Sequence, residues 1–141
     1  MYLLDTVALS ALMKPGSAPA AEAWLATIDL DELHVPAPAL GEIWRGIARL
    51  PDGAKKSALR DAYRTLMAPL VASCPAFDAS AAAIWGELMG AGDSTGRQLP
   101  ILDAQIAAIA IANDLIVVTR DVRDFGPMGV PTINPWDEHR A

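Results

Sequence analysis

Four acidic residues lie at places where the sequence predicts the end of a strand or the start of a helix. They are Asp5, Glu42, Asp103 and Asp121. Asp5 directly follows the apolar run Tyr2-Leu3-Leu4, and Asp121 comes shortly after the run 115–119. The other two acids lie where we expect the first turn of a helix. In a parallel α/β sheet, strand ends and the helix starts that follow them share one edge, where ligands bind. We therefore expect the four carboxylates to converge.

A cluster of carboxylates without thiolates or imidazoles favours a particular class of metal site. Packed carboxylates repel one another and take up protons unless a cation compensates their charge. Ligand sets made only of oxygen suit Mg²⁺ or Mn²⁺. An ion held in this way can lower the pKa of a bound water and stabilise the charge that develops on a phosphodiester. The four acids thus predict a metal-dependent nuclease.

Three of the four acids also have a purely structural explanation. A carboxylate near a helix N-terminus is favoured by the helix dipole, which would account for Glu42 and Asp103 taken singly. Asp121 fits a turn or cap residue after a strand. Asp5 has no comparable explanation, because it ends an apolar run at the start of the chain. A shared site explains all four acids together.

Length and composition indicate one globular domain, residues 1–141, with 52% hydrophobic and 20% charged residues. No apolar run reaches the roughly 18 residues of a membrane span, and Asp5 comes too early for a signal peptide. We expect a soluble, cytoplasmic protein. The lone cysteine, Cys74, indicates a core thiol, and the two histidines, His34 and His139, are too isolated to predict a metal site.

The net charge of −6 argues mildly against a broad nucleic-acid-binding face, although acids around a metal would account for part of it. Arg45, one turn after Glu42, and Arg120, next to Asp121, are candidates for holding phosphates. An ordinary exposed position explains each arginine equally well. We expect Trp44 and Trp85 to make core or dimer contacts rather than stack on bases.

Strand and helix patterns alternate along the chain. We expect helices over 7–13, 18–28, 39–50, 55–67, 79–91 and 103–113, and strands over 2–4, 34–36, within 69–77, 115–119 and 131–133. The glycine-rich stretch 90–97 indicates a mobile loop. Strands alternating with helices predict a parallel α/β sheet, and no internal repeat or linker is apparent.

Five segments around the acids form an ordered set. They are Leu3-Leu4-Asp5-Thr6, Leu40-Gly41-Glu42-Ile43-Trp44-Arg45-Gly46-Ile47, Leu102-Asp103-Ala104-Gln105-Ile106-Ala107-Ala108, Val118-Thr119-Arg120-Asp121-Val122-Arg123-Asp124-Phe125 and Asn134-Pro135-Trp136. Together they resemble PIN-domain ribonucleases, and within them the VapC and FitB-like toxins of bacterial toxin–antitoxin pairs. Each segment is a weak signal alone, but their order and spacing over nearly the whole chain are specific.

The resemblance implies a three-layer α/β/α fold and Mg²⁺- or Mn²⁺-dependent cleavage of RNA. It also implies a homodimer, a small cognate antitoxin as partner and the role of toxin in a type II pair. By position, the four acids match the metal-binding acids of the family, with Asp124 as an auxiliary acid and Thr119 as a hydrogen-bonding neighbour. The family usually has asparagine where this chain has Val7, which removes a polar group beside the site. A catalytically inactive PIN-like domain that only binds a partner is therefore the alternative.

Overall fold

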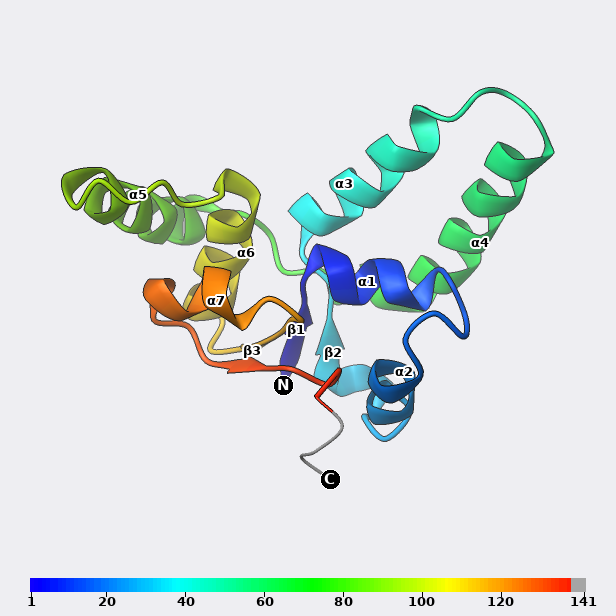
Figure 1. The fold of residues 1–141 in the computed structure, drawn as a ribbon, viewed down its shortest axis with the longest axis horizontal. Coiled ribbons are helices and arrows are strands. Elements are labelled where there is room, and N and C mark those ends of the chain that lie inside the picture. Colours follow the sequence, from blue (N-terminus) through cyan, green and yellow to red (C-terminus); the bar gives the residue numbers. More distant parts are fainter. Residues whose placement is uncertain (138–141) are drawn as a thin grey trace.

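Residues 1–137, which a computed structural model of the protein describes, contain a central sheet of four parallel strands (Figure 1). The strands are β1 (Tyr2–Leu4), β2 (Leu33–His34), β3 (Ile116–Val118) and β4 (Thr132–Ile133). Their order across the sheet is β2-β1-β3-β4, and Leu4 of β1 is paired with Val118 of β3. The prediction of a parallel α/β sheet is confirmed.

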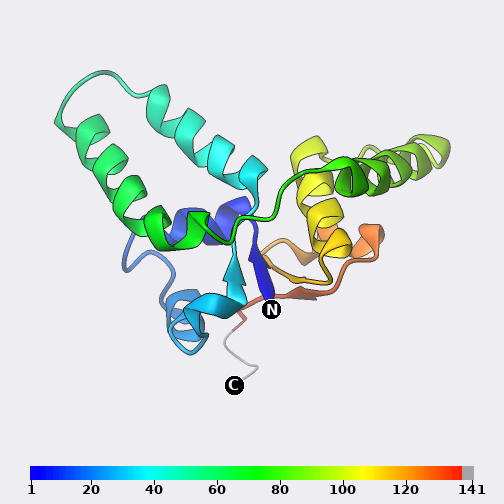
Figure 2. The same ribbon diagram turned by 180° about the vertical axis from the view of Figure 1, so that it is seen from behind.

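Helices connect the strands and cover both faces of the sheet, which gives the expected three layers. They are α1 (Thr6–Leu12), α2 (Pro19–Leu25), α3 (Ala37–Ala48), α4 (Ala54–Val71), α5 (Ala79–Ser94), α6 (Ile101–Ala112) and α7 (Val122–Phe125), with 3₁₀ turns η1 (Leu30–Glu32) and η2 (Gly126–Met128). The chain crosses from β1 to β2 in one direction and from β2 to β3 and β4 in the other. Because such crossovers are right-handed, the connecting helices lie on opposite faces. Figures 1 and 2 show α1 and α2 on one side and α6 and α7 on the other.

The core lies between the two central strands and α6. Leu3, Leu4, Val117 and Val118 are fully buried, as expected for strands covered on both faces. Six residues of α6 are also fully buried, namely Ala104, Ile106, Ala107, Ala108, Ile109 and Ala110. A helix that is apolar on nearly all sides belongs in the interior, and the sequence predicted this position for α6.

Helices α3 and α4 form a hairpin that projects away from the sheet (Figures 1 and 2). The two helices contact each other through the rings of Trp44 and Tyr63, whose centroids lie 5.0 Å apart. Gly53, with φ of +154°, directly precedes α4 and adopts a backbone conformation that other residues rarely reach. Because the hairpin projects from the sheet, most of its residues are exposed or half-buried.

The predicted strand within 69–77 is wrong. Residues 69–71 form the last turn of α4, and 72–78 contain no strand. Met67 and Leu70, three positions apart, are both buried, so the apolar stripe of the helix continues into this segment while Val71 is exposed. Pro69 removes one backbone hydrogen bond of the helix, which ends two residues later.

The predicted loop over 90–97 is wrong in its first half, because α5 continues to Ser94. The helix ends in a Schellman motif, in which the Arg97 amide donates to the Gly92 carbonyl at 2.8 Å and the Gly96 amide to the Asp93 carbonyl at 3.2 Å. Gly96 adopts the left-handed conformation that this motif requires, with φ of +71°. A Cβ atom on Gly92 would lie 2.8 Å from the Arg97 carbonyl oxygen. These glycines therefore serve a compact helix end.

Two smaller expectations concern the imidazoles and the membrane. His34 Nδ1 lies 2.9 Å from the Ser73 carbonyl oxygen, so this ring has a structural contact. His139 lies outside the described residues. Within 1–137 no helix is long and apolar enough to cross a membrane.

Candidate metal-dependent active site

Asp5 begins the site because it joins the end of β1 to the start of α1. Its backbone amide donates to the Val118 carbonyl at 3.1 Å, which continues the β1–β3 pairing by one residue. Its Oδ1 accepts the Ala8 amide at 2.8 Å and caps α1, so the expectation that Asp5 lacks a structural role is wrong. Asp5 is only 3% exposed. Burial raises the pKa of Asp5, and hydrogen bonds to its carboxylate oppose part of that shift.

Thr119 links Asp5 to Asp121. This fully buried residue follows β3, and its hydroxyl hydrogen-bonds the carboxylate of Asp5. The same hydroxyl oxygen accepts the backbone amide of Asp121 at 2.9 Å. One threonine thereby holds together the two loops that follow the central strands. This is the neighbouring position that the resemblance assigns to Thr119.

Asp103 is the half-buried acid of the group and lies in the first turn of α6, as the sequence predicted. Burial, followed by the negative charges of Asp124, Asp5 and Asp121, raises the pKa of Asp103 to about 6. These four aspartates come from three separate parts of the chain. Because the negative charges of the other three raise the pKa of Asp103, the four aspartates lie near one another at one edge of the sheet.

Asp121 and Asp124 flank the start of α7, a short helix that the sequence patterns did not predict. Asp121 is the N-cap residue of α7, and Asp124 lies in its first turn. The pKa of Asp124 is raised by burial and then by a hydrogen bond and the charge of Asp121. A carboxyl group that shares a hydrogen bond with a second carboxyl favours the protonated state at one of the two.

The structure does not place Glu42 where the sequence did. Helix α3 begins at Ala37, so Glu42 is its sixth residue and lies in the second turn. Its Oε1 lies 3.4 Å from Nη1 of Arg45, in an exposed ion pair. The groups that raise the pKa of Asp103 are three aspartates, and Glu42 is not among them. The prediction that Glu42 lies in a first helical turn is wrong because the helix starts two residues earlier than expected.

Both arginines that the sequence suggested as phosphate contacts are exposed. Arg45 is 66% exposed in its side chain. Arg120 is exposed and lines a surface hollow on α1 together with Lys14, Thr6 and Val7. The hydroxyl of Thr6, next to Asp5, is buried without a hydrogen-bond partner among the described residues. Val7, at the position where the resemblance implies asparagine, is 48% exposed and lines the same hollow.

The donor set fits Mg²⁺ or Mn²⁺ in its chemistry. Its members are carboxylates that raise one another's pKa, with an unpaired hydroxyl beside them, and a divalent cation would relieve both features. In the described part of the chain, no three carboxylate, imidazole or thiol groups already stand close enough together to hold an ion. Binding would therefore draw the aspartate side chains together.

The tryptophans divide between core and surface. Trp85 packs against the hydrophobic core, as predicted, and its ring lies 6.4 Å from that of Phe77. Trp44 is not among the residues packed against that core. Its contacts are instead with Tyr63 and with the guanidinium groups of Arg60 and Arg64. Of the two contacts predicted for Trp44, the core contact is therefore wrong, and the dimer contact stays a prediction.

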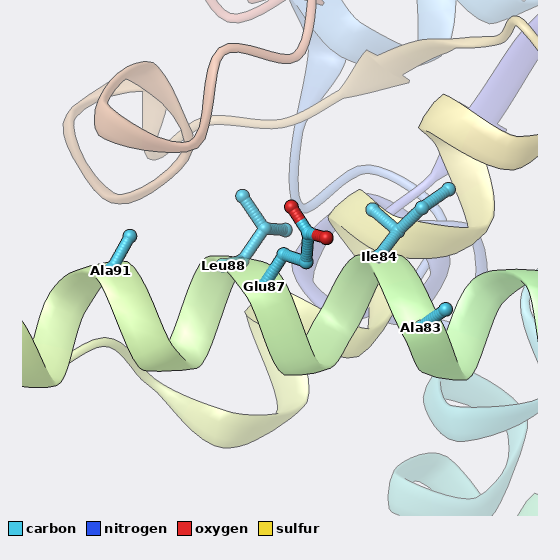
Figure 3. A pocket seen from close by; sticks show the side chains of 5 residues that line it. All are labelled: Ala83, Ile84, Glu87, Leu88 and Ala91. Carbon is cyan, nitrogen blue, oxygen red and sulfur yellow. The ribbon is translucent and has the colours of Figure 1, made fainter.

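Helix α5 carries an apolar surface on its outer side. A shallow hollow there, of about 450 Å³, is lined by Ala83, Ile84, Glu87, Leu88 and Ala91. Figure 3 shows the side chains of Ile84 and Leu88 standing out from α5 with the carboxylate of Glu87 between them. Glu87 is the one charged residue that lines this hollow, and none of the four aspartates lines it.

Comparison with known proteins bears on the whole chain. Toxin FitB of Neisseria gonorrhoeae is 32% identical over 139 residues, covering 98% of this chain and 100% of the relative. A VapC ribonuclease of Sinorhizobium fredii is 30% identical over 138 residues, covering 97% and 99%. The solved structure of FitAcB from Neisseria gonorrhoeae superposes with a TM-score of 0.89 at 30% identity, covering 97% of this chain and 99% of that one. The model of the PIN domain family matches residues 2–126, so the chain belongs to the PIN domain family.

Proposed function

We propose that the protein is a metal-dependent endoribonuclease that acts as the toxin of a type II toxin–antitoxin pair in the cytoplasm. The observation that carries the proposal is the convergence of Asp5, Asp103, Asp121 and Asp124, whose charges and burial raise the pKa of Asp103 to about 6. A protein holds such repelling acids together at a cost, which a bound cation offsets. The names of the relatives, a toxin and a ribonuclease, support the same chemistry.

Each aspartate has a distinct part in this proposal. Asp5, fixed by the Ala8 amide and Thr119, is the most rigid ligand for Mg²⁺ or Mn²⁺. Asp103 and Asp121 complete the set, and Asp124, whose pKa is raised by burial and then by Asp121, is an auxiliary acid. A bound ion would supply an activated water and stabilise the phosphodiester during cleavage. Asp103 gives up its proton when it binds the ion, so metal affinity rises with pH up to about 6.

Glu42 and the arginines are the outer members of the proposed site. Glu42 would contribute as a fourth ligand by exchanging its exposed ion pair with Arg45, a contact worth about 1 kcal/mol or less. Arg45, once released, and Arg120 would then contact the phosphates of the RNA. Asp5 is held in place by its hydrogen bonds, whereas the half-buried Asp103, the exposed Asp121 and Glu42 would move to complete the ligand set.

We also propose a homodimer and a small antitoxin as partners. Relatives have been solved as FitAcB and as FitAB bound to a DNA fragment, the latter with a TM-score of 0.88 at 29% identity. The shallow hollow on α5, which is lined by half-buried Ile84 and Leu88 and by exposed Ala83 and Ala91, is a surface that a second copy could cover. Sedimentation of the purified protein, with and without Ala91→Glu, measures the dimer directly.

A titration of Mg²⁺ and Mn²⁺ against mixed cellular RNA tests the enzyme. The variants Asp5→Asn and Asp103→Asn should lose cleavage while keeping their fold, and Asp93→Asn, an exposed acid of α5, is the matched control. Cleavage that needs metal and both aspartates supports the proposal. Full activity in either site variant contradicts the site, and an absence of both metal binding and cleavage in the wild type favours the inactive partner-binding domain, with Val7 as its cause.

A further inference from the structure

The positive charge of this acidic protein is concentrated on the α3–α4 hairpin. Residues 37–71 hold six of the eleven lysines and arginines but only three of the seventeen acids, a net charge of +3. The remainder of the chain therefore carries −9. A polyanion would be repelled by most of the protein and attracted to this hairpin.

The charges on one flank of the hairpin are arranged around an aromatic ring. The guanidinium carbons of Arg60 and Arg64 lie 5.5 and 5.8 Å from the ring centroid of Trp44. Cation–π contacts at these distances hold both guanidinium groups in place. Tyr63 packs against the same ring at 5.0 Å, which adds a second aromatic surface.

Neither arginine has an anionic partner. The ion pairs of residues 1–137 are Arg45 with Glu42 and Lys56 with Asp52, so Arg60 and Arg64 are paired with no carboxylate in this part of the chain. The Nε atom of Arg60 is buried and also lacks a hydrogen-bond acceptor. The two guanidinium groups therefore have N–H donors that no carboxylate of residues 1–137 accepts. An anion from outside the protein could bind there.

The exposed arc of α3 connects this flank to Glu42. At roughly 100° per residue, Arg49 and Arg45 lie between Glu42 and Trp44 around the helix. Arg45 and Arg49 are exposed, whereas Ala39 and Ile47 on the opposite arc are buried. Arg45 and Arg49 therefore lie on the arc of α3 that leads from Glu42 to Trp44, beside which Arg60 and Arg64 are held.

We propose that Arg60 and Arg64, held by Trp44, bind the phosphates of single-stranded RNA as it extends from the active site along α3. The inference rests on the proposed ribonuclease and names a contact for its substrate outside the metal site. Guanidinium groups beside aromatic rings are typical of surfaces that bind single strands, since they contact phosphates and also stack on bases. Trp44 acts as a positioning residue that fixes the two arginines.

Binding of a labelled 20-nucleotide uridine RNA, measured in EDTA over a range of salt concentrations, tests this site without cleavage. Arg60→Gln with Arg64→Gln should weaken binding about tenfold and reduce the salt slope by about 1.4, because each phosphate contact on a single strand contributes about 0.7. Lys55→Gln with Lys56→Gln is the control, with the same charge loss on the same helix. Arg60→Lys with Arg64→Lys should keep the slope and lose part of the affinity, which separates RNA contact from a folding defect.

The outcomes distinguish this site from the proposed enzyme. Equal weakening by the glutamine pair and the lysine control overturns the site, even if the wild type cuts RNA. RNA binding that depends on Arg60 and Arg64 supports the site, even if no metal gives cleavage and the proposed enzyme fails. A poly-glutamate peptide that binds more tightly than the RNA, and is lost in the same variant, overturns the site in favour of an acidic protein partner.

Discussion

Replacing Asp103 by asparagine should stabilise the protein in the absence of metal. The folded-state pKa of Asp103 is raised to about 6 from an ordinary value of 3.8, first by burial and then by three neighbouring aspartates. A shift of about two units corresponds to about 3 kcal/mol of unfavourable free energy when the group is ionised. Asparagine has nearly the same shape and carries no charge, so it removes this repulsion.

Two effects reduce the expected gain. Asp103 is only half-buried, so solvent screens part of the repulsion. It also lies in the first turn of α6, where a negative charge gains about 0.3–1 kcal/mol from the helix dipole that asparagine forgoes. We expect a net increase of about 1–2 kcal/mol in the free energy of unfolding at pH 7.5, or about 3–6 °C in Tm for a domain of this size.

The pH dependence tests the cause of the gain. Because the folded-state pKa is the higher one, folded Asp103 binds more protons than unfolded Asp103 between about pH 4 and 6. The contribution of this group to stability therefore falls as the pH rises through that window and stays low above it. The gain of Asp103→Asn should be largest above pH 6.5 and should vanish near pH 4.

Thermal unfolding in EDTA at pH 4, 5.5 and 7.5 measures this effect, with Asp61→Asn on the exposed side of α4 as the control. Millimolar Mg²⁺ should raise the Tm of the wild type more than that of Asp103→Asn, because the variant lacks one of the proposed ligands. A variant less stable than the wild type at pH 7.5 without metal would refute the reasoning. So would a gain of equal size at pH 4.

Three further predictions follow from the structure with less calculation. Gly92→Ala should lower the free energy of unfolding in urea by about 1–3 kcal/mol, because the new Cβ would lie 2.8 Å from a backbone oxygen. Gly90→Ala, whose Cβ would meet nothing within 4 Å, should raise it by about 0.5–1 kcal/mol. Equal effects of the two substitutions would contradict the packing of the helix end. Phe125→Ala, at a fully buried position, should cost about 3–5 kcal/mol, and a loss under 1 kcal/mol would show that α7 is not part of the core. Val7→Asn should strengthen Mn²⁺ binding in calorimetry by restoring a polar group beside Asp5, and unchanged affinity would show that Val7 does not limit the site.

The elements that sequence predicted best are those whose apolar pattern is continuous. The strands that became β1 and β3, and the buried helix α6, follow from uninterrupted apolar runs, which leave one stable position in a parallel α/β fold. The end of α4 was missed because Pro69 and an apolar run together resemble the start of a strand. Only the tertiary burial of Met67 and Leu70 shows that the helix continues.

The site was predictable to the level of the sheet edge but not of the helix face. Asp5, Asp103 and Asp121 follow from topology, because strand ends and the helix that packs beside them must meet at one edge. The direction of the Glu42 side chain depends on where α3 begins. With a start two residues earlier, Glu42 lies roughly 200° further around the helix from its first residue. Asp124 joins the group because it lies on α7. That helix has only four residues, so the sequence shows no periodicity that would predict it.

Net charge was the least informative of the sequence features, because it sums over surfaces that differ in sign. The value of −6 combines a hairpin of +3 with a remainder of −9 that includes the aspartates of the proposed metal site. A metal-dependent nuclease needs both signs, with acids to hold the cation and bases to hold the phosphates that the acids repel. Under this proposal, separating them onto different elements, the sheet edge and the α3–α4 hairpin, would let one acidic chain attract a polyanion without neutralising the carboxylates proposed to bind metal.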